Sequence, residues 1–324
     1  MDESSNQTNV KVDRKAPQWD GRIDGTEDVH LRWHQQVQSG AEAGLEGSVA
    51  LLGFASDAGV LRNKGRVGAA EGPSALRKAL APLAIHEQRK LIDLGDIVVT
   101  GDELEQGQAR LAAAVDAALS GGSLPIILGG GHETAFGTGS GIYHFYDQNP
   151  DVRVGILNLD AHFDLRRADR RSSGTPFLNL AENLQNTGRG FHYAVLGISE
   201  PNNTKVLFNA ADALGAKYLL DEDCSEQGAA EFVADFLEGI DVLYLTIDLD
   251  VLPASVAPGV SAPAGLGVPM KIISQVCKQV ASSGKLKVAD VVELNPKYDV
   301  DSRTARSAAR LIYALATTKS TPAN

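Results

Sequence analysis

Short apolar runs recur along most of this chain, and stretches with helical periodicity separate them. The runs are rich in Val, Ile and Leu and mostly lack the polar–apolar alternation that marks a half-exposed strand. Each run therefore predicts a strand that is buried on both faces. Eight runs have this character: Val49–Phe54, Leu91–Leu94, Leu124–Leu128, Val152–Leu159, Tyr193–Ile198, Lys217–Leu220, Val242–Ile247 and Val288–Leu294.

The segments between these runs predict helices. Pro73 followed by Ser74 is a typical helix start, and the Ala-rich segment 106–119 places Leu111, Val115 and Leu119 on one side. Segments 229–237 and 269–280 have the same character. Strands that alternate with helices over this length predict a parallel α/β sheet that is covered on both faces.

Acidic residues and histidines follow three of the predicted strands. Gly-Gly-Gly-His-Glu at 129–133 contains His132, Asp-Ala-His-Phe-Asp at 160–164 contains Asp160, His162 and Asp164, and Asp-Leu-Asp at 248–250 contains Asp248 and Asp250. Ligands of parallel α/β sheets bind beyond the carboxyl ends of the strands, so we expect these clusters to meet at one edge. Glu293 ends another predicted strand and is expected at the same edge.

Spacing within these clusters indicates that their side chains bind a common cation. Residues two apart on an extended backbone point the same way, and several ionisable groups buried together are costly unless a cation binds them. A single Asp-x-His-x-Asp motif would be explained equally well by a solvated strand end or by an Asp that caps the next helix. Three clusters, each after a buried strand, favour a metal site over that explanation.

The ligand types predict which metal binds. Carboxylates and imidazoles without a thiolate favour Mn²⁺, or Fe²⁺, Co²⁺ or Zn²⁺ in its place, over a structural zinc. Four carboxylates supply enough negative charge for two cations about 3.5 Å apart, which would generate a hydroxide nucleophile near neutral pH. The sequence contains no Gly-x-Ser-x-Gly, no P-loop and no Cys beside a His. It therefore predicts a metal-dependent hydrolase.

Composition limits the partners and the location. The chain has 324 residues, 43% hydrophobic content and a net charge of −11 without a run of Lys or Arg, which argues against nucleic acid. The polar residues 1–18 lack a signal core, and no apolar run is long enough to span a bilayer. We expect a soluble cytoplasmic protein with one domain at 18–318 and flexible tails at 1–17 and 319–324. The oligomeric state stays open, a homo-oligomer included.

The order of these motifs resembles the ureohydrolase family, which comprises arginases and agmatinases, over roughly residues 48 to 315. The family's segments are Gly-Gly-x-His, Asp-Ala-His-x-Asp and Asp-x-Asp-x-x-x-Pro, and the third of them reads Asp-Leu-Asp-Val-Leu-Pro here, at 248–253. The resemblance implies an α/β fold, a three-layer α/β/α sandwich with a mostly parallel eight-stranded sheet. That fold agrees with the eight runs counted above.

The resemblance also implies two Mn²⁺ ions per subunit with defined ligands. His132, Asp160, Asp164 and Asp248 would hold one ion, and Asp160, His162, Asp248 and Asp250 would hold the other. Asp160 and Asp248 would bridge the two ions. Glu293 matches the family carboxylate that orients the cationic guanidinium or amidine of the substrate.

Further segments resemble the branch of this family that hydrolyses N-formimidoyl-L-glutamate to glutamate and formamide in histidine degradation. They are Gly-Phe-Ala-Ser-Asp at 53–57, Asn-Lys-Gly-Arg-Val-Gly-Ala at 63–69, the histidine motif at 129–133, Phe-Asp-Leu-Arg at 163–166 and Ser-Ser-Gly-Thr-Pro-Phe at 172–177. The resemblance implies attack by a bridging hydroxide on the amidine carbon. Asp164 would then carry a proton to the leaving nitrogen and Glu293 would hold the amidinium.

This small-molecule substrate carries two carboxylates, so its site should contain Arg, whose planar fork pairs with carboxylates. Arg166 lies two residues beyond Asp164, and Asn63, Lys64 and Arg66 are further candidates. Ser173 and Thr175 would donate hydrogen bonds to a carboxylate or shape a turn. Arg167, Arg170 and Arg171 are better explained as solvated loop charges.

One departure from the family means that the arginase mechanism does not carry over whole, and it counts against a guanidino substrate. Arginases carry a proton-transfer histidine in a Gly-Asn-x-His-Gly loop after the Asp-Ala-His-x-Asp segment, and this chain has no histidine between His162 and His192. The alternatives are a ureohydrolase acting on a guanidino substrate such as agmatine, a mononuclear deacetylase on the same fold, or a non-catalytic metal or metabolite sensor. The second ligand set, His162 with Asp250, counts against the deacetylase.

Overall fold

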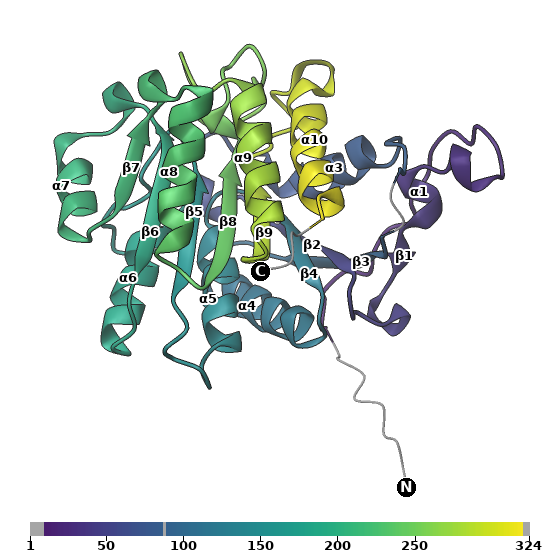
Figure 1. The fold of residues 1–324 in the computed structure, drawn as a ribbon, viewed down its shortest axis with the longest axis horizontal. Coiled ribbons are helices and arrows are strands. Elements are labelled where there is room, and N and C mark those ends of the chain that lie inside the picture. Colours follow the sequence, from purple (N-terminus) through teal and green to yellow (C-terminus); the bar gives the residue numbers. More distant parts are fainter. Residues whose placement is uncertain (1–9, 87–88, 320–324) are drawn as a thin grey trace, which may run out of the picture.

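The computed structural model describes residues 10–86 and 89–319 and shows one parallel sheet of nine strands (Figure 1). The strand order is β1-β3-β2-β4-β9-β8-β5-β6-β7. The strands are β1 (Gln38–Ser39), β2 (Val49–Ala55), β3 (Leu91–Val98), β4 (Leu124–Leu128), β5 (Val154–Leu159), β6 (His192–Ile198), β7 (Lys217–Leu220), β8 (Val242–Asp248) and β9 (Leu286–Val292). All eight predicted strands are present, so the predicted fold class is confirmed. The added strand, β1, has only two exposed residues and no apolar pattern that could reveal it.

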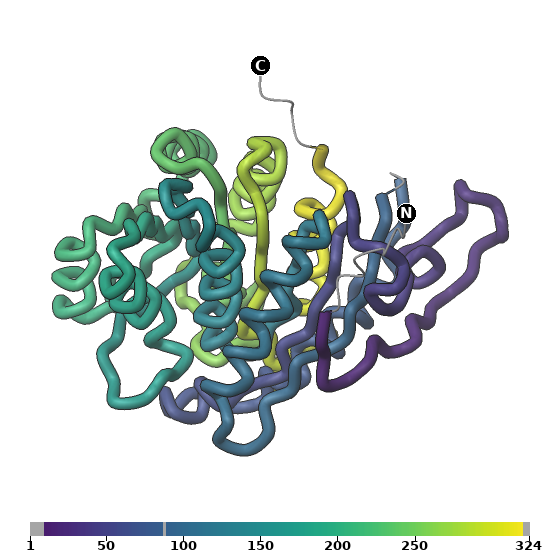
Figure 2. The backbone as a smooth tube through the Cα atoms, turned by 90° about the horizontal axis from the view of Figure 1, so that it is seen from below, coloured from purple at the N-terminus to yellow at the C-terminus, as the bar shows by residue number. Residues whose placement is uncertain are grey.

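Helices cover both faces of the sheet and complete three layers (Figures 1 and 2). One face packs against α3 (Gly72–Leu80), α8 (Glu226–Glu238), α9 (Met270–Ser282) and α10 (Arg303–Thr317). The other packs against α4 (Leu104–Ser120), α5 (Thr134–Phe145), α6 (Pro176–Asn186) and α7 (Lys205–Ala213). Two short helices, α1 (Trp33–Gln36) and α2 (Ala58–Arg62), lie in connecting segments. No helix of residues 10–86 and 89–319 is both long and apolar enough to cross a membrane.

Neighbouring residues of one strand contribute to different cores. In β8, Leu245 belongs to the core beneath α8, α9 and α10, whereas Tyr244 belongs to the core beneath α4, α5 and α6. Leu51 and Leu52 of β2 divide in the same way. Because both faces are buried, every position of such a strand can be apolar, which is why the strands appear as continuous apolar runs.

Part of the predicted N-terminal tail packs against the sheet. Val10 is buried, and Arg14 forms an antiparallel bridge to Asp96 in β3. Residues 10–17 are therefore placed beside β3, whereas the predicted domain boundary lies at residue 18, and residues 1–9 fall outside the described part. Farther along, the Trp19 indole donates to Asp93 at 2.8 Å.

The strand order brings the predicted metal ligands together. Four adjacent strands in the middle of the sheet are β4, β9, β8 and β5, although they are far apart in the sequence. Because all of them run parallel, their carboxyl ends lie at one edge, where ligands of such sheets bind.

Candidate metal centre

All six predicted metal ligands, together with Glu293, lie at the carboxyl ends of these four strands. His132 is in the turn between β4 and α5, Asp160, His162 and Asp164 follow β5, Asp248 and Asp250 are at the end of β8, and Glu293 follows β9. The carboxylates are buried, and the His162 side chain is 21% exposed. A group of this composition is expensive to bury unless its charges are balanced.

The Nδ1 atom of His132 is surrounded by three carboxylate oxygens. It lies 3.2 Å from Asp160 Oδ2, 2.9 Å from Asp164 Oδ2 and 3.1 Å from Asp248 Oδ2. Despite these distances, Nδ1 is a buried atom without a hydrogen-bond partner, because none of the oxygens lies in a hydrogen-bonding direction. Adjacent ligands of an octahedral ion with bonds of about 2.1 Å are separated by roughly 3.0 Å. His132, Asp160 and Asp248 offer ligand atoms that all lie within 4.8 Å of one another, so these three fit one divalent cation. Asp164 approaches Nδ1 but lies outside that group, and its role as a ligand stays a prediction.

A second group of ligand atoms forms around His162. Its Nδ1 lies 3.1 Å from Asp250 Oδ2 and 3.5 Å from Asp160 Oδ1. Asp160 thus offers one oxygen to each histidine, as a ligand that bridges two cations would. Asp248 groups with His132 and Asp160, and its bridging role stays a prediction.

Neighbouring groups fix the orientation of these ligands. Thr246 Oγ1 lies 3.0 Å from His132 Nε2, so Nδ1 is the nitrogen that faces the carboxylates. Asp160 accepts from Asn158 Nδ2 at 2.9 Å and from the His162 backbone N–H at 2.7 Å. Partners of this kind set ring and carboxylate orientation in metal sites and raise ligand basicity.

Burial and crowding of like charges perturb the site. Burial raises the pKa of Asp248 well above its usual value, and the charges of Asp250 and Asp160 add to the effect. Burial lowers the pKa of His132, but the three carboxylates close to its ring outweigh burial and raise that pKa well above the usual value. Cations would relieve the repulsion among these carboxylates, so the donor set fits two hard divalent ions in both charge and chemistry.

Backbone strain is concentrated around this site. Lys64, Asp164 and Glu293 have φ values of 61°, 51° and 69°, a region that side chains rarely adopt. Each costs about 1–3 kcal/mol and persists only where the surrounding structure imposes it. The strain at Asp164 and Glu293 turns their carboxylates toward the same edge of the sheet.

Glu293 presents one unpaired oxygen to the site. Its Oε1 accepts from the His132 backbone N–H at 2.8 Å, whereas Oε2 is buried without a partner among the described residues. Burial raises the pKa of Glu293 to about 8, with Glu133 adding to the shift. A buried oxygen of this kind is a natural acceptor for a cationic N–H of a ligand.

A cavity of about 310 Å³ lies beside the ligands. Four of the five predicted substrate-binding residues line it, namely Asn63, Arg66, Arg166 and Ser173. Thr175 does not: its Oγ1 accepts from the Ser172 backbone N–H at 2.9 Å and donates to the Ser172 carbonyl, which supports the turn-shaping alternative. Ser261 and Ala262 also line the cavity, and no sequence motif singled them out.

Three cationic side chains line the cavity without a direct ion pair to a described carboxylate. Lys64, Arg66 and Arg166 line it, and none of the three forms an ion pair within the described chain. Arg66 instead donates to the Ser261 carbonyl at 3.0 Å and stacks over the Tyr298 ring. Unpaired cations beside a cavity are suited to an anionic ligand.

The other arginines of the Arg-rich loop after β5 have partners of their own. Arg167 pairs with Glu182 at 2.9 Å and Arg170 with Asp102 at 2.5 Å, as expected of solvated charges. Arg171 is not one of these: it lies over the Phe136 ring at 3.7 Å and is half-buried. Its predicted place among the solvated charges was wrong, because α5 supplies an aromatic face for it.

Glu133 anchors the loop that carries Lys64 and Arg66. Its buried Oε1 accepts from Ser56 Oγ at 2.7 Å and from the Gly59 backbone N–H at 2.9 Å. Its carbonyl accepts from Gln108 Nε2, and Gln108 Oε1 accepts a hydrogen bond from Arg171. The residue next to the ligand His132 therefore ties both loops that line the cavity to the end of β4.

A profile of known sequences, described as the arginase family, matches residues 47–317. The chain belongs to the arginase family. Among family members, a formimidoylglutamase from Rhodococcus jostii (strain RHA1) is 53% identical over 304 residues, which cover 93% of this chain and 95% of that protein. A formimidoylglutamase from Chromobacterium violaceum is 48% identical, with 94% and 98% covered.

Solved structures of the arginase family share the fold. A formiminoglutamase from Trypanosoma cruzi with Mn²⁺ superimposes with a TM-score of 0.74 at 27% identity, covering 83% of this chain and 92% of that one. Arginase from Bacillus subtilis gives a TM-score of 0.71 at 25% identity, covering 84% and 99%.

Proposed function

We propose that this chain hydrolyses N-formimidoyl-L-glutamate to L-glutamate and formamide in histidine degradation, with two Mn²⁺ ions bound per subunit. Family membership supports a hydrolase, and relatives about half identical to the chain bear the name of this activity. The presence of Mn²⁺ in the Trypanosoma cruzi structure supports the choice of metal.

The observation that carries the substrate assignment is the charge of the cavity. Lys64, Arg66 and Arg166 line it without an ion pair in the described chain, beside the carboxylate of Glu293. The proposed substrate has two carboxylates and one amidinium, which complement this pattern. A guanidino substrate such as agmatine has no carboxylate and would leave these cations without partners.

The residues around His132 and His162 would hold the two cations, and when bound these supply a strong nucleophile by lowering the pKa of water. The reaction joins a water oxygen to the amidine carbon and breaks the bond from that carbon to the glutamate nitrogen. The nitrogen must gain a proton as it leaves, since an unprotonated amine is a poor leaving group.

Two carboxylates of the chain would orient the substrate and move the proton. Glu293 would accept an amidinium N–H at Oε2, its oxygen without a partner. Asp164 lies at the boundary between the ligand group and the cavity, and would carry the proton to the leaving nitrogen. No histidine lies between His162 and His192 to take this role, as one does in the arginase loop.

Product analysis tests the proposal directly. Mn²⁺-loaded protein is incubated separately with N-formimidoyl-L-glutamate, N-formyl-L-glutamate, arginine and agmatine, and glutamate, formamide and urea are measured. We expect glutamate and formamide from the first substrate alone. Urea from arginine or agmatine would move the chain to the guanidino branch, and no product from any substrate would favour the sensor.

A further inference from the structure

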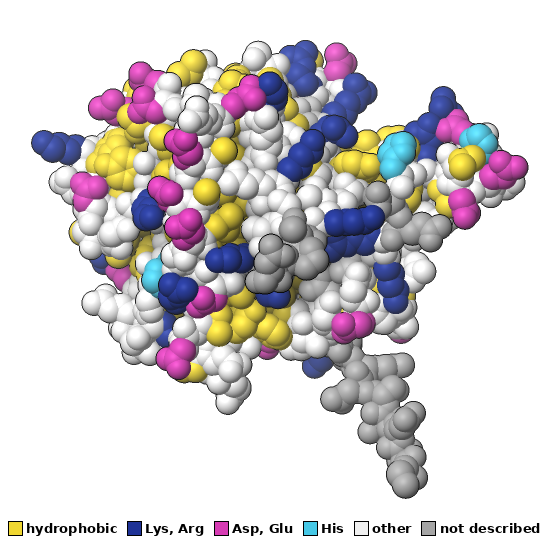
Figure 3. Space-filling view, viewed as in Figure 1, with side chains coloured by type: hydrophobic (Ala, Val, Ile, Leu, Met, Phe, Trp, Pro, Cys, Tyr) yellow, Lys and Arg dark blue, Asp and Glu magenta, His cyan; other side chains and the backbone are white. Residues whose placement is uncertain are grey.

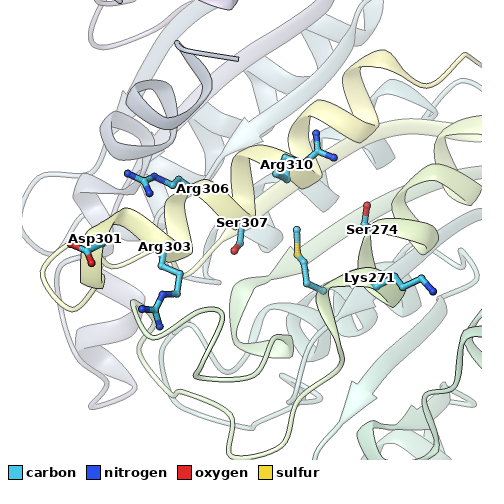
Figure 4. Close-up of a pocket in the computed structure, with 8 residues that line it drawn as sticks. Lys271, Ser274, Asp301, Arg303, Arg306, Ser307 and Arg310 are labelled. Carbon is cyan, nitrogen blue, oxygen red and sulfur yellow. The ribbon is translucent and has the colours of Figure 1, made fainter. Parts of the chain in front are cut away.

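A groove with a volume of about 740 Å³ lies between α9 and α10, away from the metal centre. Its residues are Met270, Lys271 and Ser274 from α9, Arg303, Arg306, Ser307 and Arg310 from α10, and Asp301, two residues before α10. Figure 4 shows the three arginines leaving successive turns of α10. In the space-filling view, Lys and Arg side chains form a row over this helix (Figure 3).

The cations of this groove are largely unpaired. Arg303, Arg306 and Arg310 form no ion pair with any described residue, and Lys271 alone has one, with Glu226 at 2.6 Å. Most arginines of the described chain do pair with a carboxylate. The exceptions are Arg66 and Arg166 in the catalytic cavity, the three groove arginines, Arg89 and Arg171.

This concentration of charge is unexpected in a chain with a net charge of −11. Arg306 and Arg310 are four residues apart on one helix, a spacing at which like charges destabilise the helix by about 0.2–0.5 kcal/mol. The groove also begins at a strained turn, since Asp301 and Ser302 both have a φ of 53°. Repulsion and strain retained together at one place are typical of a site that binds something.

We propose that the groove between α9 and α10 binds a small oxyanion with at least two negative charges, through Arg303, Arg306 and Arg310. The groove volume lies within the roughly 300–1,000 Å³ of small-molecule sites. From Arg303 to Arg310 the helix rises about 10.5 Å, which is the length of a small polycarboxylate or a sugar bisphosphate. Ser274 and Ser307 add hydroxyl donors on the two sides.

The groove is joined to the catalytic cavity through one loop. Arg303 donates to the Ser255 carbonyl at 3.0 Å, and the Gly259 backbone N–H donates to Thr304 Oγ1 at 2.8 Å. Two residues farther on, Ser261 accepts from Arg66 in the cavity. Binding at Arg303 therefore steadies the loop 255–261.

Calorimetric titration of the Mn²⁺-loaded chain tests the site with two probes, benzene-1,3,5-tricarboxylate and fructose 1,6-bisphosphate. The test variant is R306Q/R310Q, and the matched control is K205Q/K217Q, which removes two exposed charges elsewhere. Losing two charge-assisted contacts should weaken binding about tenfold or more in the test variant, with the control unchanged. Tighter binding of the tricarboxylate would identify a carboxylate ligand, and tighter binding of the bisphosphate would identify a phosphate ligand.

Equal weakening in both variants would show a general charge effect and overturn the proposal, as would the absence of binding of either probe at millimolar concentration. Circular dichroism confirms that each variant is folded. Amide exchange in residues 255–261 should slow when the probe binds, and unchanged exchange would overturn the link to the cavity. These measurements involve no turnover, so they are independent of the proposed reaction.

Discussion

At the scale of single residues, neighbouring groups hold the residues of the site in energetically unfavourable conformations and contacts. Asp164 and Glu293 adopt left-handed backbone conformations, and His132 keeps an unpaired nitrogen among three carboxylate oxygens. The ligands could be found from the sequence because a spacing of two on a strand end is a local pattern. Ser261 could not be found, because its place in the cavity depends on a long loop that folds back from β8.

Replacing a ligand of the second group should abolish turnover and leave the fold intact. In Asp250→Asn or His162→Ala, one cation loses a ligand, so bound metal should fall from two ions per chain toward one. Metal analysis and turnover measure this, with Asp235→Asn, an exposed residue of α8, as control. Rates like those of the parent chain in either metal-washed variant would contradict the two-metal assignment.

Arg166→Ala should raise KM for N-formimidoyl-L-glutamate while metal content stays the same. Loss of a charge-assisted contact to a carboxylate corresponds to about 1.5–3 kcal/mol, or roughly 10-fold to 150-fold in KM. Arg167→Ala is the matched control, because Arg167 is the next residue and pairs with Glu182 instead. An equal KM in the two variants would remove Arg166 from substrate recognition.

Glu133→Ala should raise KM as well, although Glu133 does not line the cavity. The change leaves the Ser56 hydroxyl and the Gly59 N–H buried without an acceptor, at about 1–3 kcal/mol each, and loosens the loop that carries Lys64 and Arg66. Glu133→Gln keeps one acceptor oxygen and should recover part of the affinity. An unchanged KM in Glu133→Ala would show that the loop keeps its position without the hydrogen bonds to Glu133.

At the scale of elements, the positions of the strands were predictable but their order was not. A strand buried on both faces is a continuous apolar run, and all eight runs became strands. The predicted burial was wrong for Lys217–Leu220, because β7 lies at the edge of the sheet and none of its residues is fully buried. These runs are chemically alike, so nothing in them states that β9 lies between β4 and β8. The order had to come from the structure, or from the family resemblance.

The glycine run before His132 permits a close approach between two elements. A Cβ on Gly130 would lie 1.9 Å from the carbonyl oxygen of Ser56, a backbone atom that cannot turn away. Gly130→Ala should therefore destabilise the chain by about 1–3 kcal/mol or more and lower its metal content. Thermal unfolding and metal analysis measure both, with Gly265→Ala, where a Cβ meets no atom within 4 Å, as control.

At the scale of the whole molecule, stability is expected to depend on the metal. The buried carboxylates repel one another, so any cation that binds the folded chain stabilises it by mass action. At free Mn²⁺ of about 100 times its Kd, the gain is about 2.7 kcal/mol for one site. Chelation should lower the Tm of the parent chain more than that of His162→Ala, and equal shifts would contradict stabilisation through both ligand groups.

Homo-oligomerisation and a cytoplasmic location stay predictions.

The position of β9 also governs when the metal centre can exist. β9 is the last strand along the described chain, yet it lies in the middle of the sheet and separates β4 from β8. Until residues 286–292 are in place, nothing holds His132 at its distance from Asp248, although both have long since been synthesised. We therefore expect ion loading to follow the synthesis of β9, and a chain shortened before β9 to lose the centre while keeping all six predicted ligands.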